Sequence, residues 1–412
     1  MTLSWPCEYP GTHWFDEEEE RAVLDVLRSR SLFRYYGPGK PKYVDALEAA
    51  ARDFYGTRHA LAVNSGSGAL ITALSALETG PGDEVIIPAL MWVATAAAVV
   101  QCNAIPVLCE VDDGFNMDPA DLEQKITPRT KLILPVHMAG SPCDMDAIMA
   151  AADRHGIRVL EDCAQANGGT FRGRKLGTFG AMGIYSFQLN KNMTAGEGGL
   201  IVTDDERLYL RAFSAHDMSL LWRNGQPSDP EPEVLAWAGG RRMSELCGAV
   251  ASIQLLKLPR IVAHMRASHR RICAALEGVP GLQLRRLNDA EGDTGPFLVF
   301  LLENEAGAIR VLERMKAAGL HSAYRLADYG LHVYYNIATL ANKVPLSAAG
   351  NPWTLGQNAQ SVYDYRKGAC PRSDALFARS ILLPIPSCLT EEQEAAAVQV
   401  IKAAVSTEAP LA

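Results

Sequence analysis

Short apolar runs alternate with helix-like stretches between about residues 58 and 205, and no other feature of the sequence constrains the fold as strongly. The runs are rich in Val, Ile and Leu and are mostly apolar on both faces, which is typical of buried strands in a mainly parallel sheet. Because strands and helices alternate, we expect an α/β domain whose ligands bind at the carboxyl ends of the strands. The predicted strands are His59–Asn64, Glu84–Pro88, Ile105–Val111, Lys131–His137, Arg158–Glu161, Gly183–Phe187 and Gly199–Thr203, with helices at Ser67–Leu77, Met91–Cys102, Pro119–Ile126 and Met145–His155.

The remainder of the chain predicts a second, smaller domain. A polar, proline-rich connector at residues 223–234 precedes a long helical segment at Met243–Leu276. Beyond it we expect a strand at Pro296–Leu302, helices at Ala306–Ala318 and from Glu391, and a loop rich in Gly, Pro and Asn at Ala341–Gln360. We therefore predict a large α/β domain with an N-terminal arm over residues 1–255 and a small α+β domain over residues 256–412.

Composition excludes several classes of protein. The net charge of −8 argues against a dedicated nucleic-acid binder, which usually carries a basic face. The longest largely apolar run, Ala89–Val100, is shorter than the roughly 20 residues of a membrane span, and the N-terminus has no signal-peptide pattern. Nine scattered cysteines without CxxC spacing support neither a metal site nor a disulfide framework. We expect a reduced cytoplasmic enzyme that binds no metal.

Three polar signals lie within the α/β region. The turn Asn64–Leu70 opens a helix directly after a strand, so that its backbone N–H groups could bind a phosphate, although a plain tight turn is also compatible. Asp162 ends a buried strand, where a carboxylate could cap a helix, bind a metal or pair with a cationic ring nitrogen. Lys191 follows a polar turn and precedes Gly196–Gly199, which suggests unusual backbone geometry rather than a solvated surface lysine. A phosphate turn, a strand-end carboxylate and a loop lysine in this order are what a pyridoxal 5′-phosphate (PLP) site requires.

With these residues in view, the chain resembles the DegT/DnrJ/EryC1/StrS family of sugar aminotransferases, which are fold-type-I PLP enzymes. The resemblance runs from about Pro10 to Leu383. Its markers are Gly80–Val85, Pro135–His137 with Gly140, Glu161–Gln165, Ser186 and Phe187, Lys191, and Gly196–Gly199. The resemblance implies a large domain with a mainly parallel seven-stranded sheet, a smaller C-terminal domain, and at least a homodimer whose active sites are shared between subunits.

The resemblance also implies roles for individual residues. Lys191 would form the Schiff base with the cofactor and shuttle protons, and Asp162 would pair with the pyridine nitrogen. Gln165 would hydrogen-bond the phenolic oxygen. Trp92 would stack on the pyridine ring, with a core tryptophan as the alternative. The phosphate would lie on Gly66, Ser67 and Ser186.

One departure from the family pattern concerns the neighbouring subunit. Where the family usually has an Asn that reaches the partner's phosphate, this chain has Gly240, followed by Arg241 and Arg242. Arg241 is the candidate to replace that contact with a charge, and plain surface charge is the alternative.

The implied activity is transfer of an amino group from an amino acid, L-glutamate or L-glutamine, to a keto-sugar or keto-cyclitol by a ping-pong mechanism. Ser31–Gly37 and His332–Asn336 are either substrate-facing loops or packed aromatics at a domain seam. An NAD-dependent sugar oxidoreductase would leave Lys191 unexplained, and the intact Lys191, Asp162 and Gln165 argue against a silent sensor. The dehydratases of the family replace the lysine with histidine. No nucleic-acid or membrane partner is expected.

Overall fold

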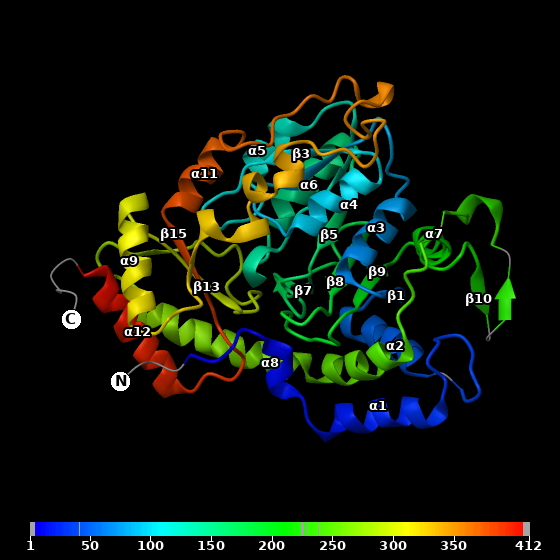
Figure 1. Cartoon of the computed structure of the whole chain (residues 1–412), viewed down its shortest axis with the longest axis horizontal. Coiled ribbons are helices and arrows are strands. Elements are labelled where there is room, and N and C mark those ends of the chain that lie inside the picture. Colours follow the sequence, from blue (N-terminus) through cyan, green and yellow to red (C-terminus); the bar gives the residue numbers. More distant parts are fainter. Residues whose placement is uncertain (1–4, 41, 224–225, 229, 238, 407–412) are drawn as a thin grey trace.

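A seven-stranded sheet forms the centre of the molecule (Figure 1). The computed structural model describes residues 5–40, 42–223, 226–228, 230–237 and 239–406. The strand order is β1-β9-β8-β5-β4-β2-β3, and β9 alone runs antiparallel to its neighbours. The strands are β1 (His59–Val63), β2 (Glu84–Pro88), β3 (Ile105–Cys109), β4 (Thr130–Ile133), β5 (Arg158–Asp162), β8 (Met182–Ser186) and β9 (Gly199–Thr203). The predicted α/β class and all seven predicted strands are confirmed.

The strand β4 ends earlier than its apolar run suggested. The prediction extended it to His137, whereas the ladder stops at Ile133. Pro135 has no N–H to donate, so regular pairing cannot continue. The chain nevertheless stays extended beside β5, because the Asp162 N–H donates to the Pro135 carbonyl and the His137 N–H donates to the Asp162 carbonyl.

Helices cover both faces of the sheet, which explains why its strands are apolar on both sides. Val85 and Ile87 of β2 pack into one core, and Ile86 between them packs into the opposite one. The first core includes α3 (Gly66–Ala76), α4 (Val93–Gln101) and α7 (Glu206–His216). The second includes α2 (Tyr43–Tyr55), α5 (Pro119–Lys125), α6 (Met145–His155) and α8 (Glu245–Leu276).

The C-terminal part contains a four-stranded antiparallel sheet with its own apolar core. Its strands, in the order β12-β13-β15-β14, are β12 (Gln283–Leu284), β13 (Phe297–Leu301), β14 (Tyr324–Arg325) and β15 (Ser380–Pro384). The helices are α9 (Glu305–Ala317), α10 (Ala338–Ala341), α11 (Pro371–Ala378) and α12 (Glu391–Val405). The proposed boundary after residue 255 falls inside α8, whose Leu258 and Met265 pack under the large sheet while Ile272 and Leu276 pack with the small one.

The long helix α8 runs beneath both parts of the molecule (Figure 1). It contacts α2 and α12, and also α1 (Glu17–Ser29) of the N-terminal arm. Of the described helices, α8 alone is long and apolar enough to cross a membrane by length and composition. Its apolar positions contribute to both cores, as expected of a central helix in a folded domain.

Of the two regions predicted to be irregular, one contains part of a hairpin and the other is a loop. The connector expected at 223–234 contains more structure than predicted, since β10 (Leu221–Arg223) pairs with β11 (Gln226–Ser228) and a 3-10 turn follows at Pro232–Val234. The stretch Ala341–Gln360 is a loop, as expected, and its described residues form no strand. Asn358 holds this loop in place by accepting from the Gly82 N–H and donating to the Asn103 carbonyl.

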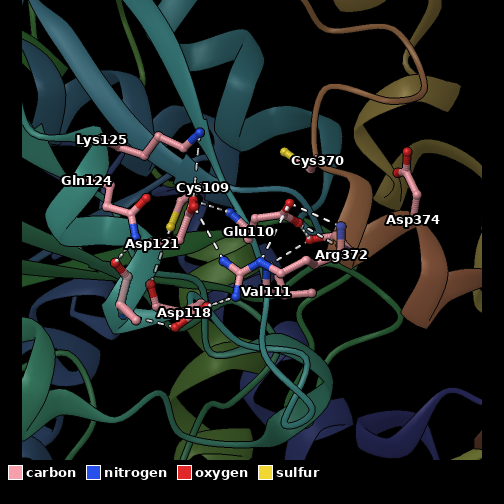
Figure 2. Close-up of polar contacts among 12 residues, drawn as sticks. Cys109, Glu110, Val111, Asp118, Asp121, Gln124, Lys125, Cys370, Arg372 and Asp374 are labelled. Atoms are coloured by element: carbon pink, nitrogen blue, oxygen red, sulfur yellow. Dashed lines mark hydrogen bonds and ion pairs between the residues drawn. The ribbon is translucent and has the colours of Figure 1, made fainter.

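A polar cluster joins α11 to the end of β3 (Figure 2). The Glu110 carboxylate accepts from the backbone N–H groups of Arg372 and Ser373, at 3.1 and 2.7 Å. The Arg372 guanidinium in turn contacts Asp118 at 2.7 Å and Asp121 at 3.4 Å. The cluster thereby attaches a helix of the C-terminal part to the edge of the large sheet.

Candidate active site

A cavity of about 410 Å³ lies at the carboxyl ends of β5 and β8. It is closed by the first turns of α3 and α4, by the N-terminal segment, and by residues of the C-terminal part. Seven of the eight predicted site residues line it, namely Gly66, Ser67, Trp92, Asp162, Gln165, Ser186 and Lys191. Its position agrees with the expectation that ligands bind at the carboxyl ends of the strands.

One end of the cavity has the features of an anion-binding site. The N-cap Ser65 accepts from the Gly68 N–H at 2.9 Å, and α3 then starts at Gly66. The N–H groups of the first helical turn have no acceptor within the helix, so they and the helix dipole favour a negative group there. A Cβ at Gly66 would lie 2.7 Å from the Cβ of Ser186. Glycine is therefore required for the turn to lie against the Ser186 hydroxyl.

Asp162 occupies the floor of the cavity. Its side chain is buried and accepts from Thr95 Oγ1 at 2.9 Å and from the Ala164 N–H at 3.0 Å. Burial raises the pKa of the carboxyl, and the two hydrogen bonds and the charge of Lys191 oppose this rise. No helix begins after Asp162 in this described part of the chain, so the helix-cap reading is wrong. The carboxylate is instead fixed where it can face a cationic partner.

Gln165 is oriented by the backbone. Its Oε1 accepts from the Ala139 N–H at 3.0 Å, and no residue that the structure describes accepts from the amide Nε2. The turn that supplies this N–H has left-handed residues at Ala139 (φ 54°) and Gly140 (φ 80°). A Cβ at Gly140 would lie 2.3 Å from Pro296 Cδ, so glycine is needed there for both conformation and space.

Lys191 is half-buried and has a free amine. Among the described residues, none forms a hydrogen bond or ion pair with its Nζ. Burial lowers the pKa of the ammonium group, and the nearby charge of Asp162 opposes this change. The loop after it contains Gly196 at φ 77° and Gly198 at φ 154°, which confirms the unusual backbone geometry expected of this segment. A lysine with a lowered pKa and no partner is suited to act as a nucleophile.

Aromatic side chains form the wall opposite the sheet. Trp92 is 42% exposed and lines the cavity, so the alternative of a core tryptophan is wrong. His332 lies between Trp92 and Tyr329, with ring centroids at 4.8 and 4.1 Å. Burial and the charge of Lys191 lower the pKa of His332 to about 3, so the ring is neutral at physiological pH. Its Nδ1 donates to the Tyr329 carbonyl at 3.3 Å, leaving Nε2 as an acceptor.

Two predicted features lie away from the cavity of their own chain. The Arg241 side chain packs beside Gly68, and its backbone is held by the His216 carbonyl and the Asn64 N–H. In the segment Ser31–Gly37, Tyr35 stacks on Trp222 with centroids 4.8 Å apart. Within one chain this segment is therefore a packed aromatic cluster, and only the His332 end of the second predicted loop lines the cavity.

A buried hydrogen-bonded network behind Asp162 was not predicted. The Glu161 carboxylate accepts from the N–H groups of Gly177, Phe179 and Gly180, and contacts His137 Nε2 at 3.2 Å. The other nitrogen of His137 accepts from the Cys143 N–H. These side chains could by position share a metal with Cys163. Since hydrogen bonds already use the carboxylate and both ring nitrogens, the group braces the end of β5.

The fold and this site together define a fold-type-I PLP-dependent aminotransferase, and comparison with known proteins agrees. The profile of the DegT/DnrJ/EryC1/StrS aminotransferase family matches residues 14–402, and the chain belongs to this family. It is 36% identical to a UDP-N-acetyl-3-dehydro-alpha-D-glucosamine 3-aminotransferase of Acidithiobacillus ferrooxidans over 87% of each chain. It is 44% identical to the GDP-perosamine synthase of Caulobacter vibrioides over 56% of this chain and 60% of that protein.

A solved structure supports the fold over nearly the whole chain. The 3-amino-5-hydroxybenzoic acid synthase has a TM-score of 0.79 at 27% identity and covers 98% of this chain and 99% of its own. The resemblance, fold class and aminotransferase activity inferred from the sequence are thus confirmed. The family also implies PLP as the cofactor.

Proposed function

We propose that this protein uses PLP to transfer an amino group from L-glutamate or L-glutamine to the ketone of a keto-sugar or keto-cyclitol. The observation that carries this proposal is the convergence, on one cavity, of the free amine of Lys191, the buried carboxylate of Asp162 and the open first turn of α3. A lysine nucleophile, an acceptor for a ring N–H and a phosphate cradle are the parts that a PLP site needs.

The residues present fit the cofactor. Gly66, Ser67 and Ser186 would hold its phosphate, Asp162 its ring nitrogen, Gln165 Nε2 its phenolic oxygen and Trp92 one face of its ring. When bound, the cofactor supplies a carbonyl for the incoming amine and a ring that takes up the electron pair released at the donor carbon.

The chain's own groups supply the proton transfers. Lys191 Nζ moves a proton at the substrate carbon, because its lowered pKa lets it act as a base. Asp162 keeps the ring nitrogen protonated, which requires its ionised form. The cationic ring would restore that form against the cost of burial. The lysine at position 191 argues against the dehydratase chemistry of family members that carry histidine there.

The names of relatives support a sugar acceptor. One relative is named for a GDP-linked amino sugar and another for a UDP-linked 3-dehydro sugar. Nucleotide-linked keto-sugars are therefore candidate acceptors beside free keto-sugars and keto-cyclitols.

We further propose a homodimer with shared active sites, located in the cytoplasm. Of the described residues that line the cavity, Lys191 is the one lysine or arginine, whereas Glu8, Asp162 and Glu197 are acids. A phosphate and the carboxylates of a donor amino acid need further positive charge, which a second copy would bring. The nine cysteines are all free, as expected in a reducing compartment.

The decisive experiment compares Lys191→Ala with the exposed control Lys40→Ala. Wild-type and control proteins reconstituted with PLP should show the visible absorbance of the bound cofactor and lose it on addition of L-glutamate. Lys191→Ala should show neither change, with turnover lower by several orders of magnitude. A borohydride-fixed cofactor on any other lysine, or a reaction that requires NAD, would contradict the proposal.

A further inference from the structure

The N-terminal segment before α1 forms part of the cavity wall and is held at both ends. Trp5 Nε1 donates to the Pro384 carbonyl at 3.2 Å, and Ser387 Oγ donates to the Pro10 carbonyl at 2.6 Å. The Gly11 N–H donates to the carbonyl of Lys191 at 3.3 Å. Glu8 lies between these anchors and lines the cavity. Its position is therefore fixed relative to the reacting lysine.

The Glu8 carboxylate has no partner within the described chain. Among residues 5–40, 42–223, 226–228, 230–237 and 239–406, none forms a hydrogen bond or ion pair with it. It is partly buried, and burial raises the pKa of its carboxyl. Burying a carboxylate without a hydrogen-bond donor costs free energy. A ligand that donates hydrogen bonds to Glu8 would offset this cost.

The surroundings of Glu8 suit a polyhydroxylated ligand. Burial raises the pKa of Tyr329, and the nearby charge of Glu8 adds to this rise. Tyr329 stacks on His332, which lies beside Trp92. Trp92, His332 and Tyr329 thus line the cavity wall between the predicted position of the cofactor ring and Glu8. Their ring faces can pack against the C–H faces of a sugar or cyclitol ring. His332 Nε2 and the Glu8 oxygens are acceptors along this wall, and ligand hydroxyls are donors.

We propose that Glu8 binds hydroxyl groups of the amino acceptor and selects acceptors that carry neutral hydroxyls, rather than carboxylate or phosphate, at that end of the cavity. This proposal rests on the proposed function. Two carboxylate oxygens can accept from adjacent hydroxyls of a pyranose or cyclitol, whereas an anionic group at the same place is repelled. The amino donor carries carboxylates and therefore avoids Glu8, so the residue acts in the second half-reaction and not in the first.

The test separates the two half-reactions in the PLP-loaded enzyme. The amine-loaded form, prepared with L-glutamate and desalted, is mixed with scyllo-inosose, with 3-keto-D-glucose, with a nucleotide-linked 4-keto-6-deoxyhexose, or with 2-oxoglutarate. The return of the cofactor absorbance is followed in wild type, Glu8→Gln, Glu8→Ala and the control Glu17→Gln, whose carboxylate is exposed on α1 and pairs with Arg21. Melting temperatures are measured on the same preparations.

For the best neutral ketone, Glu8→Ala should raise the half-saturating concentration about 10- to 100-fold, as expected for lost hydrogen bonds to a charged group. Glu8→Gln should have an intermediate effect. The reactions with L-glutamate and 2-oxoglutarate should stay within about twofold of wild type, or become faster. An unchanged ketone reaction, or an equal loss with ketone and 2-oxoglutarate, would overturn the role of Glu8. If wild type reacts with 2-oxoglutarate and no ketone, the proposed acceptor class itself fails.

Discussion

Asp162 and Lys191 line the same cavity, and burial opposes the charged form of each. The pKa of Asp162 is raised by burial and that of Lys191 is lowered by burial, so folding disfavours the charged form of both groups. A ligand that places an opposite charge beside either group would lower the free-energy cost of burying its charged form. Such opposed shifts at the end of one sheet are typical of a catalytic site rather than of a structural ion pair.

The first prediction concerns Asp162→Asn. An acid whose folded pKa is raised destabilises the fold above that pKa, and this cost disappears below its ordinary value of about 4. The cofactor-free variant should therefore be at least as stable as wild type at pH 7 to 8, with an advantage that shrinks as the pH falls towards 4.

Asn can still accept from Ala164, but it cannot hold a ring nitrogen protonated, so the half-reaction with L-glutamate should slow about 100-fold or more. Thermal unfolding across pH and stopped-flow absorbance measure the two effects. Lowered stability with a normal rate would contradict this role.

Individual site residues differed in how readily the sequence revealed them. Gly66, Asp162 and Lys191 lie in local patterns that match the chemistry proposed for them, and all three line the cavity, as the sequence predicted. Thr95 left only a weak signal, a hydroxyl interrupting the apolar run Ala89–Val100, and its bond to Asp162 is visible only in three dimensions. No local pattern marks Glu8, because its position at the cavity depends on hydrogen bonds of its segment to β15 and to the loop after β15, which are far away in the sequence.

At the level of elements, the strands and helices of the sheet were predicted closely because their periodicity is local. β2, β9 and α6 have the predicted bounds. The hairpin of β10 and β11 was missed because its polar, proline-rich sequence has no apolar alternation. Its Trp222 instead packs against Tyr35, far away in the sequence. Contacts of this kind depend on the fold as a whole, and no local pattern encodes them.

The second prediction concerns how α11 begins. Its N-cap, Cys370, makes no side-chain capping bond, and Glu110 from the end of β3 accepts from the first N–H groups in its place (Figure 2). Glu110→Ala would remove the acceptor from both N–H groups, of which that of Ser373 is buried, and should lower the free energy of unfolding by about 2 to 4 kcal/mol. Urea denaturation of the cofactor-free protein measures this. The control Glu123→Ala removes exposed contacts with Arg154 and His155 and should change little. Equal midpoints for both variants would refute the capping role.

At the scale of the whole molecule, apolar side chains are exposed around the segment that carries Arg241. Trp237 is 96% exposed, and Met218, Leu235 and Tyr36 are also exposed. Large exposed apolar groups near one another mark an interaction surface. The Arg241 backbone lies in the same region, so a second copy bound there would lie close to Arg241.

The last prediction tests whether Arg241 completes the partner's site or its own. Arg241→Ala should weaken cofactor retention several-fold and leave the dimer intact, because one charge-assisted contact is lost.

Hybrid dimers with Lys191→Ala in one subunit and Arg241→Ala in the other then separate the two arrangements. If Arg241 serves the neighbouring site, the Arg241→Ala subunit keeps its own Lys191 and receives an intact Arg241 from its partner. The hybrid should therefore show about half of wild-type activity with a normal cofactor requirement. If Arg241 acts beside its own Gly68, the hybrid keeps the weak cofactor binding of the Arg241→Ala dimer. Unchanged cofactor affinity in that dimer would reduce Arg241 to a packing role, and a monomer at micromolar concentration would overturn the shared site.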